Sequence, residues 1–215
     1  MRILVTGATG FLGFRVTEYL ATIDEVKSIV ATGRTIKKYH HLTDPKVDYV
    51  LGDLADLAFV SSVMKNVDFV IHAAALSSPW GRFEDFEQAN LIVQKNIIQI
   101  AEEIGIKRMV FVSTPSLYFD HSDRLNIRES DPLPSKFINN YAYTKRLAEI
   151  ELENSSIPFV ILRPRALIGR GDTVIMPRLI RANNEGKLRI IGRGNNLVDL
   201  TPVANVVDAI WLSLQ

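Results

Sequence analysis

The sequence predicts an α/β protein built on a doubly wound parallel sheet. Near-continuous runs of Val, Ile and Phe alternate with segments of helical periodicity, which is typical of parallel strands covered by helices on both faces. The first strand-like run leads directly into a glycine-rich turn and a helix. With 215 residues, of which 47% are hydrophobic and 23% charged, the chain suits a globular fold with a sizeable core.

Strand-like and helix-like segments follow one another in a regular order. Strands are expected at 3–6, 26–32 and 47–51, in "VDFVIHAAA" ending near Ala73, in "RMVFVS" ending at Ser113, and in "IPFVILRP". Helices are expected at 11–21, 55–65, 83–104 and 141–153. Because crossovers between parallel strands are right-handed, these units form a doubly wound sheet.

Composition and charge exclude several classes of partner. The 25 basic and 24 acidic residues leave a net charge of +1, so no nucleic-acid or membrane-surface partner is expected. The chain has no cysteine, which removes disulfides and thiolate chemistry, and its four histidines lack the spacing of metal ligands. No apolar run is long enough to span a membrane, and the strand pattern beginning at Arg2 leaves no room for a signal segment, so we expect a cytoplasmic protein.

Three glycines, Gly7, Gly10 and Gly13, stand between the first strand and the first helix. Glycine allows a tight turn and lets a ligand approach the backbone, and the helix N-terminus offers unpaired N–H groups with a partial positive charge. This geometry suits a pyrophosphate, so we predict a dinucleotide site here. The alternative is an ordinary strand-to-helix turn.

The segment "TGATGFLG" resembles the fingerprint of the extended short-chain dehydrogenase/reductase family, also described as the NAD-dependent epimerase/dehydratase family. Similar segments follow in the family's order, so that the resemblance spans essentially the whole chain: "GDL" at 52–54, "HAAA" at 72–75, "VSTPSLY" at 112–118, "YAYTK" at 141–145 and "LRPRALIGRGD" at 162–172. The resemblance implies a Rossmann dinucleotide-binding domain at 1–163 and a substrate-binding region at 164–215. Because family members continue further, this second region is expected to be only partly present.

The resemblance also implies a set of cofactor contacts. They are Gly7, Thr9, Gly10, Phe11, Leu12, Gly13, Arg34, Asp53, Leu54, Ala73, Ala74, Ala75, Tyr141, Lys145 and Pro164. In the family, the residue matching Asp53 contacts the adenine, and the turn matching 73–75 packs against the cofactor. Asp53 could instead be the N-cap of the helix that follows it.

The choice between NADP and NAD depends on the end of the second strand. Gly33 occupies the position of the acidic residue that would bind a ribose 2′-hydroxyl, and Arg34 follows it. A guanidinium suits a 2′-phosphate, with Lys37 and Lys38 adding positive charge nearby, so NADP is favoured and NAD remains possible. The alternative is a solvated basic loop.

Tyr141 and Lys145 are the predicted catalytic pair. Four residues apart on a helix, they share one face, so that the ammonium can favour the ionised form of the phenol. By the family pattern, Tyr141 exchanges a proton with the substrate oxygen while Lys145 also holds the nicotinamide ribose. The family further supplies a hydroxyl after the fifth strand, and we assign it to Thr114, with Ser113 as the alternative; either hydroxyl could instead cap the strand end.

Departures from the family pattern narrow the reaction. Sugar dehydratases of the family carry an Asp-Glu pair after the catalytic hydroxyl residue, whereas Thr114 is followed by Pro115 and Ser116, which argues against dehydration. Asn90 matches a family asparagine, although the usual Gly-Thr after it is replaced by Val-Gln.

The stretches "HAAALSSPWGRFEDFEQAN" and "RPRALIGRGD" resemble the 3β-hydroxysteroid dehydrogenase and β-keto acid reductase branch. This resemblance implies a hydrophobic or steroid-like small-molecule alcohol/ketone substrate, and the family resemblance implies a possible homodimer. The NADPH preference indicated by Arg34 favours reduction of the ketone. Two alternatives remain open: an NAD-dependent nucleotide-sugar epimerase, and a non-catalytic NADPH-binding sensor or scaffold.

Overall fold

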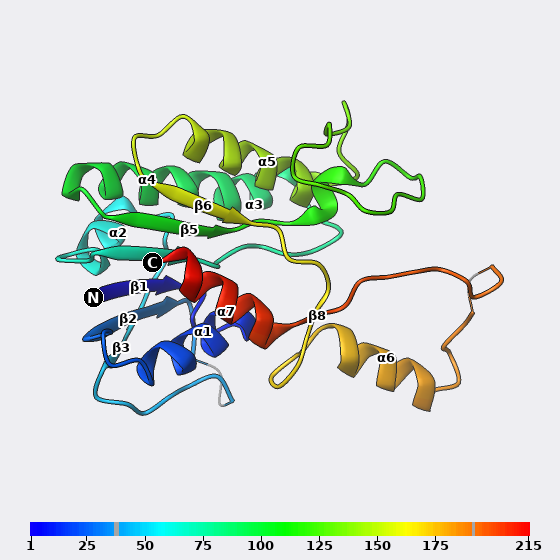
Figure 1. Cartoon of the computed structure of the whole chain (residues 1–215), viewed down its shortest axis with the longest axis horizontal. Coiled ribbons are helices and arrows are strands. Elements are labelled where there is room, and N and C mark those ends of the chain that lie inside the picture. Colours follow the sequence, from blue (N-terminus) through cyan, green and yellow to red (C-terminus); the bar gives the residue numbers. More distant parts are fainter. Residues whose placement is uncertain (37–38, 191) are drawn as a thin grey trace.

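The computed structural model describes residues 1–36, 39–190 and 192–215; Lys37 and Lys38, predicted to add positive charge near a 2′-phosphate, lie outside them. Six strands form one parallel sheet (Figure 1). They are β1 (Arg2–Thr6), β2 (Ser28–Gly33), β3 (Val47–Leu51), β4 (Phe69–His72), β5 (Arg108–Val112) and β6 (Phe159–Leu162). Every strand predicted from the sequence is present, which confirms the doubly wound fold.

The strand order is β3-β2-β1-β4-β5-β6. The chain proceeds outward from β1 through β2 to β3, and then returns to the other side of β1 to build β4, β5 and β6. This reversal leaves a crevice beyond the carboxyl ends of β1 and β4, which is where ligands bind in open α/β sheets.

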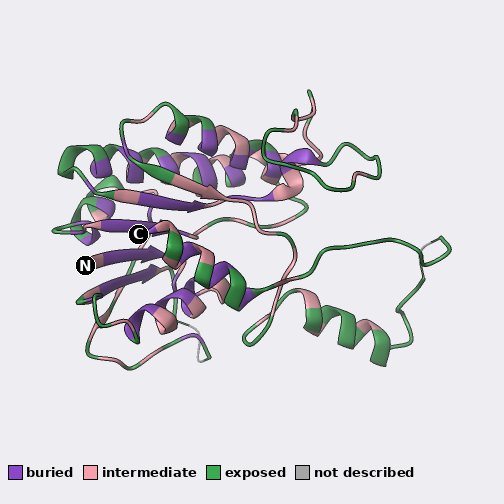
Figure 2. Cartoon of the chain, in the orientation of Figure 1, coloured by how far each residue is buried: buried purple, intermediate pink, exposed green. Residues whose placement is uncertain are grey.

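Two apolar cores hold helices against the two faces of the sheet. On one face, α2 (Leu57–Val63), α4 (Val93–Ile104) and α5 (Asn140–Glu153) bury side chains such as Val60, Ile97 and Leu152. On the other face, α1 (Phe11–Ala21) and α7 (Val203–Ser213) bury Leu20 and Ile210. Figure 2 shows the buried residues concentrated in the strands and on the inner faces of these helices.

The helix predicted at 83–104 is divided by a π-helical turn. It consists of α3 (Phe83–Phe86), the π turn η1 (Glu87–Ile92) and α4. A 3₁₀ turn, η2 (Pro115–Tyr118), follows β5. Such π turns occur often at functional sites, and this one holds Asn90.

The segment after β6 is organised less compactly. A short parallel pair joins β7 (Leu167–Ile168) to β8 (Thr201–Pro202), and between them α6 (Ile175–Asn184) has no buried residue. Figures 1 and 2 show α6 and the exposed segment after it extending away from the sheet, whereas α7 returns to pack beside α1.

Candidate active site

The glycine turn brings backbone segments too close together for side chains. Gly7 has a φ of +69°, and a Cβ on it would lie 2.8 Å from the Ala74 nitrogen. A Cβ on Gly13 would lie 2.2 Å from the Gly7 carbonyl oxygen. The turn thus packs against the end of β4 and directs the N-terminus of α1 into the crevice, where the unpaired N–H groups of a helix start favour an anion.

A similar close contact lies at the end of β2. A Cβ on Gly33 would lie 2.3 Å from Oγ1 of Thr9. An acidic side chain therefore cannot occupy position 33 beside Thr9, while Arg34, the next residue, is exposed at the crevice.

A groove of about 290 Å³ runs across the carboxyl ends of the central strands. Its walls are Gly7, Thr9, Gly10, Gly33, Arg34, Thr35, Gly52, Asp53, Leu54, Ala73, Ala74, Ala75, Leu76, Ala89 and Val93. Nine of the predicted cofactor contacts are in this set. Their meeting in one groove fits a bound dinucleotide, because glycines and alanines leave room for it and the helix start faces its phosphates.

Six predicted contacts lie outside the walls of this groove. Tyr141 and Lys145 are described below, and the other four are described here. Gly13 packs beneath Gly7, and Leu12 packs against the core between α1 and the sheet. The ring of Phe11 comes within 3.5 Å of where a Cβ on Gly171 would be. Pro164 stands two residues beyond β6.

Asp53 does not cap a helix. Its Oδ1 accepts a hydrogen bond from the Ala55 N–H at 2.9 Å, while α2 begins later and has Asp56 as its N-cap, with the Ala58 N–H donating at 2.9 Å. The capping alternative for Asp53 is therefore wrong, and its carboxylate lines the groove.

A buried hydrogen-bond relay supports the turn after β4. Nδ1 of His72 lies 2.6 Å from Oγ1 of Thr6, and the same oxygen accepts from the Ala74 N–H at 3.1 Å. Burial first, and the charge of Lys145 second, lower the pKa of His72 to about 3. His72 was not predicted as a site residue. Its place at the start of "HAAA" was the feature of the sequence that could have indicated this role.

Asn90 joins the π turn to the groove and to α5. Its Oδ1 accepts from the Leu76 N–H at 2.8 Å, and its Nδ2 donates to Oγ1 of Thr144 at 3.1 Å. The side chain is buried, with both ends of its amide bonded. Asn90 thus fixes the groove wall at Leu76 relative to the helix that carries Tyr141.

The hydroxyl of Tyr141 interacts with two other hydroxyls. It makes side-chain hydrogen bonds with Ser77 and Thr114, and both lower its pKa, although the larger effect of burial leaves that pKa raised. Ser77 directly follows Leu76 of the groove wall, so Tyr141 lies where the cofactor groove ends. Ser77 was not predicted as a site residue.

The two hydroxyls after β5 have different surroundings. Thr114 caps η2, because its Oγ1 accepts from the Ser116 N–H at 3.2 Å, and it also reaches Tyr141. The Oγ of Ser113 is buried and has no hydrogen-bond partner among the described residues. The geometry therefore favours Thr114 as the third candidate catalytic group, and Thr114 also performs the capping that was its alternative.

Lys145 is buried on α5, four residues after Tyr141 and on the same face of the helix. Its Nζ donates to the Val112 carbonyl at 2.7 Å and lies 3.8 Å from the centre of the Phe111 ring, while only 1% of the residue is exposed. Burial lowers the pKa of Lys145 to about 7, and the charge of Glu149 opposes this shift.

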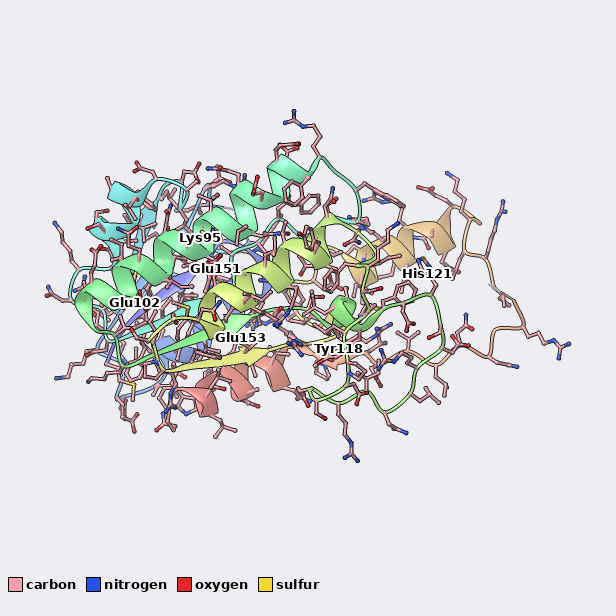
Figure 3. The ribbon with its side chains drawn as sticks, turned by 90° about the horizontal axis from the view of Figure 1, so that it is seen from above. Lys95, Glu102, Tyr118, His121, Glu151 and Glu153 are labelled. Carbon is pink, nitrogen blue, oxygen red and sulfur yellow. The ribbon has the colours of Figure 1, made fainter. Side chains whose placement is uncertain are left out.

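A buried ion pair stands behind Lys145, and the sequence analysis did not predict it. Glu149, one helical turn further along α5, is fully buried and accepts two hydrogen bonds from Arg163, at 2.9 and 2.6 Å. Arg163 also donates to the hydroxyl of Tyr118, which Figure 3 shows on the turn beside the end of β6. The "RLAE" and "LRP" sequences that contain this pair were the available signal.

A second cavity of about 640 Å³ is bordered by Pro115, the residue after Thr114. Its walls include Pro115 and Tyr118 of η2, Arg163 and Arg165 after β6, and apolar side chains of the two exposed segments. Those apolar residues are Phe119, Leu125, Ile127, Leu197 and Val198. The rest of its wall is polar or charged and consists of Ser122, Asp123, Arg124, Asn126, Arg128, Glu129 and Asp199.

Comparison with known proteins identifies the family. The NAD dependent epimerase/dehydratase family matches residues 3–215. The chain belongs to this family. Members of the family with related sequences include the 2-alkyl-3-oxoalkanoate reductase of Stenotrophomonas maltophilia, 34% identical over 100% of this chain and 66% of the reductase. Human sterol-4-alpha-carboxylate 3-dehydrogenase, decarboxylating, is 32% identical over 96% of this chain and 55% of its own length. These relatives confirm the resemblance to the hydroxysteroid dehydrogenase and β-keto acid reductase branch.

Solved structures of the epimerase/dehydratase family have the same fold. The UDP-glucuronic acid 4-epimerase of Bacillus cereus, in complex with UDP-glucuronic acid and NAD, superposes with a TM-score of 0.84 at 25% identity, covering 100% of this chain and 73% of the epimerase. The chain spans about two thirds or less of the length of the curated relatives named above. Within the described residues, no helix is long and apolar enough to cross a membrane, and no cluster of metal-ligating side chains occurs.

Proposed function

We propose that this chain carries the cofactor site and catalytic groups of an NADP-dependent oxidoreductase that interconverts a secondary alcohol and a ketone. One observation supports this proposal most strongly: the Tyr141 hydroxyl bonds to Ser77 and Thr114 at the end of the groove, and the buried Lys145 lies one turn further along the same face of α5. Such an arrangement can exchange a proton with a substrate oxygen in a site that excludes water.

In the direction of reduction, the ketone oxygen accepts hydrogen bonds from Thr114 and Tyr141 and then takes the phenolic proton. The nicotinamide, when bound, supplies the hydride to the carbonyl carbon. Lys145 stabilises the negative charge left on the Tyr141 oxygen until a proton from solvent replaces the one transferred. The products are the secondary alcohol and the oxidised cofactor.

Gly33 and Arg34 support NADP over NAD. Position 33 has no room for the carboxylate that would bind a ribose 2′-hydroxyl. Arg34 offers a planar guanidinium to a 2′-phosphate. We expect Arg34→Ala to weaken NADPH binding about tenfold or more and to leave NADH binding nearly unchanged.

For the substrate, we propose a hydrophobic 3-oxo or 3-hydroxy acid. The names of two relatives, an oxoalkanoate reductase and a carboxylate 3-dehydrogenase, both describe a reaction between hydroxyl and ketone at a carbon that one further carbon separates from a carboxylate. The apolar side chains of the second cavity would accommodate an alkyl substituent.

Fluorescence titrations with NADPH and NADH test cofactor binding before any substrate is known. Reduction of 3-oxododecanoate and its 2-methyl derivative is then followed by NADPH absorbance in wild type, Tyr141→Phe and the control Tyr143→Phe. Tyr143 is on the same helix but packs against Phe83 and Phe137. We expect a loss of about 100-fold or more in Tyr141→Phe alone, and equal rates in all three proteins would refute the catalytic assignment.

A second candidate, an NAD-dependent nucleotide-sugar epimerase, is favoured by the likeness to the Bacillus cereus epimerase. It predicts tight retention of NAD and no net oxidation of the cofactor. Equal affinity for NADH and NADPH, with epimerisation of UDP-glucuronic acid, would support it. NADPH binding without turnover of either substrate would support a sensor or scaffold.

A further inference from the structure

The charge of Lys145 depends on what surrounds its ammonium. Ionisable side chains surround it on three elements. Tyr141 and Glu149 lie four residues before and after it on α5, His72 lies on β4, and Arg163 follows β6 and binds Glu149. Uncharged groups cover the rest, because Nζ lies against the Phe111 ring and the Val112 carbonyl. Such surroundings remove an ammonium from water and favour its neutral form.

Glu149 provides the negative charge that opposes this effect. Its position four residues after Lys145 places both on one face of α5, and its side chain is fully buried. His72 has a pKa of about 3 and so adds no charge at neutral pH. Tyr141 adds none either, since burial raises its pKa.

Arg163 fixes the position of this carboxylate. Its Nε and one terminal nitrogen bind both oxygens of Glu149, and its other terminal nitrogen binds the Tyr118 hydroxyl. Arg146 adds a third contact to Glu149 at 3.1 Å. One guanidinium thereby joins α5, which carries Tyr141 and Lys145, to η2, which begins after Thr114.

We propose that Glu149, oriented by Arg163, is a positioning residue that keeps Lys145 cationic on the face of α5 that carries Tyr141. The inference rests on the proposed catalytic role of the Tyr141 and Lys145 pair. It assigns to Glu149 a function that a purely structural ion pair would not have. In this arrangement Glu149 supplies the negative charge that acts on Lys145, and Arg163 holds the Glu149 carboxylate in place.

A titration of Lys145 in the cofactor-free protein tests this directly. Lysine labelled with ¹³C at Cε is incorporated, the Lys145 signal is assigned by its loss in Lys145→Met, and its midpoint is measured in wild type and Glu149→Gln. We expect the midpoint to fall by about one pH unit in Glu149→Gln, because the amide keeps the shape and loses the charge. Loosened packing would have the opposite effect, because water reaching Nζ raises the midpoint towards that of a free lysine.

Glu153→Gln is the matched control. Glu153 is on the same helix and shares Arg146 as a partner, at 2.7 Å, but it is partly exposed and does not contact Arg163. Its position near the end of α5 is labelled in Figure 3. The Lys145 midpoint in this variant should equal that of the wild type.

If Glu149→Gln does not fold, Glu149→Asp replaces it, since this variant keeps a carboxylate but withdraws it towards its own backbone. A smaller downward shift is then expected. An unchanged or raised midpoint in a folded Glu149 variant would overturn the inference. Because the readout needs neither cofactor nor substrate, its failure is distinct from a failure of the proposed reaction.

Discussion

The side chains of Thr6 and His72 form a buried hydrogen bond, with Oγ1 of Thr6 2.6 Å from Nδ1 of His72. Because Thr6 Oγ1 already accepts from the Ala74 N–H, its own proton is available for Nδ1 of a neutral imidazole. Protonating His72 would break this arrangement and add a second buried cation near Lys145. The two strands that border the crevice, β1 and β4, are thus joined by a pair that requires His72 to be neutral.

Replacing His72 with Asn should flatten the acid side of the stability profile. The pKa of His72 is about 3 in the folded protein and 6.5 in the reference state, so the unfolded chain binds more protons between these values and stability falls as pH falls through that window. From pH 7 to pH 5, the wild type should lose about 2 kcal/mol more than His72→Asn. Urea unfolding at both pH values measures this, with His121→Asn, in an exposed loop, as control. Parallel profiles for the two variants would contradict it.

Gly33→Asp should weaken both cofactors unless Thr9 is changed as well. The new Cβ would lie 2.3 Å from Oγ1 of Thr9, so the wall of the groove must shift. Removing the Thr9 side chain in Thr9→Gly/Gly33→Asp creates room for the carboxylate beside a ribose 2′-hydroxyl. We expect the double variant to prefer NADH over NADPH in fluorescence titrations. If the single variant already binds NADH more tightly than wild type, the steric argument is wrong.

Gly13→Ala should damage the fold and the cofactor site together. The added Cβ would meet the Gly7 carbonyl oxygen at 2.2 Å, in a segment held by backbone on both sides. Overpacking of this kind typically costs about 1–3 kcal/mol of stability. Gly10→Ala is the milder comparison, because its Cβ would lie 3.2 Å from the same oxygen. Urea unfolding and NADPH titrations of the two variants test whether Gly13→Ala loses more stability and cofactor affinity than Gly10→Ala. Equal losses in the two variants would contradict the expectation.

Lys145→Met should abolish activity, and it should also remove the free-energy cost of burying the Lys145 ammonium group. The folded pKa of Lys145 is about 7 and its reference value is 10.5, so the unfolded state binds more protons in this window and the wild type gains stability as pH rises through it. Relative to wild type, Lys145→Met should therefore be about 2 kcal/mol more stable at pH 7 than at pH 9. Denaturant unfolding at both pH values provides the test. Lys95→Met, a partly exposed lysine that faces Glu151 in Figure 3, should show no such change.

Local sequence patterns were sufficient to predict the sheet. The apolar runs correspond to β1 to β6 within a few residues of the expected bounds. They were recognisable because parallel strands covered by helices on both faces are apolar along their whole length. The glycine turn was predictable for a similar reason, since the close approach of Gly7 and Gly13 excludes other side chains. The assignment of Tyr141 and Lys145 rested on the family resemblance and on their place in the helix after the fifth strand, because the same spacing alone is usually structural.

The remaining contacts depend on pairs distant in the sequence. Arg163 meets Glu149 because β6 lies beside β5 in the sheet and α5 covers that face, which no local pattern expresses. Ser77 reaches Tyr141 only through the loop after β4, whose path is determined by Asn90. The π turn was missed because its apolar periodicity differs from that of an α-helix by a single residue.

The extra residue of the π turn sets the rotation of the preceding residues, including Asn90 at the groove wall, relative to α4. An α-helix advances about 100° per residue, so deleting one residue within Glu87–Ile92 would convert the π turn into a regular turn and rotate everything before it by that angle relative to α4. Asn90 could not then keep both Leu76 and Thr144 as partners. Insertions and deletions in this stretch are therefore constrained in a way that substitutions are not, and a homologue one residue shorter here must hold its groove wall by different side chains.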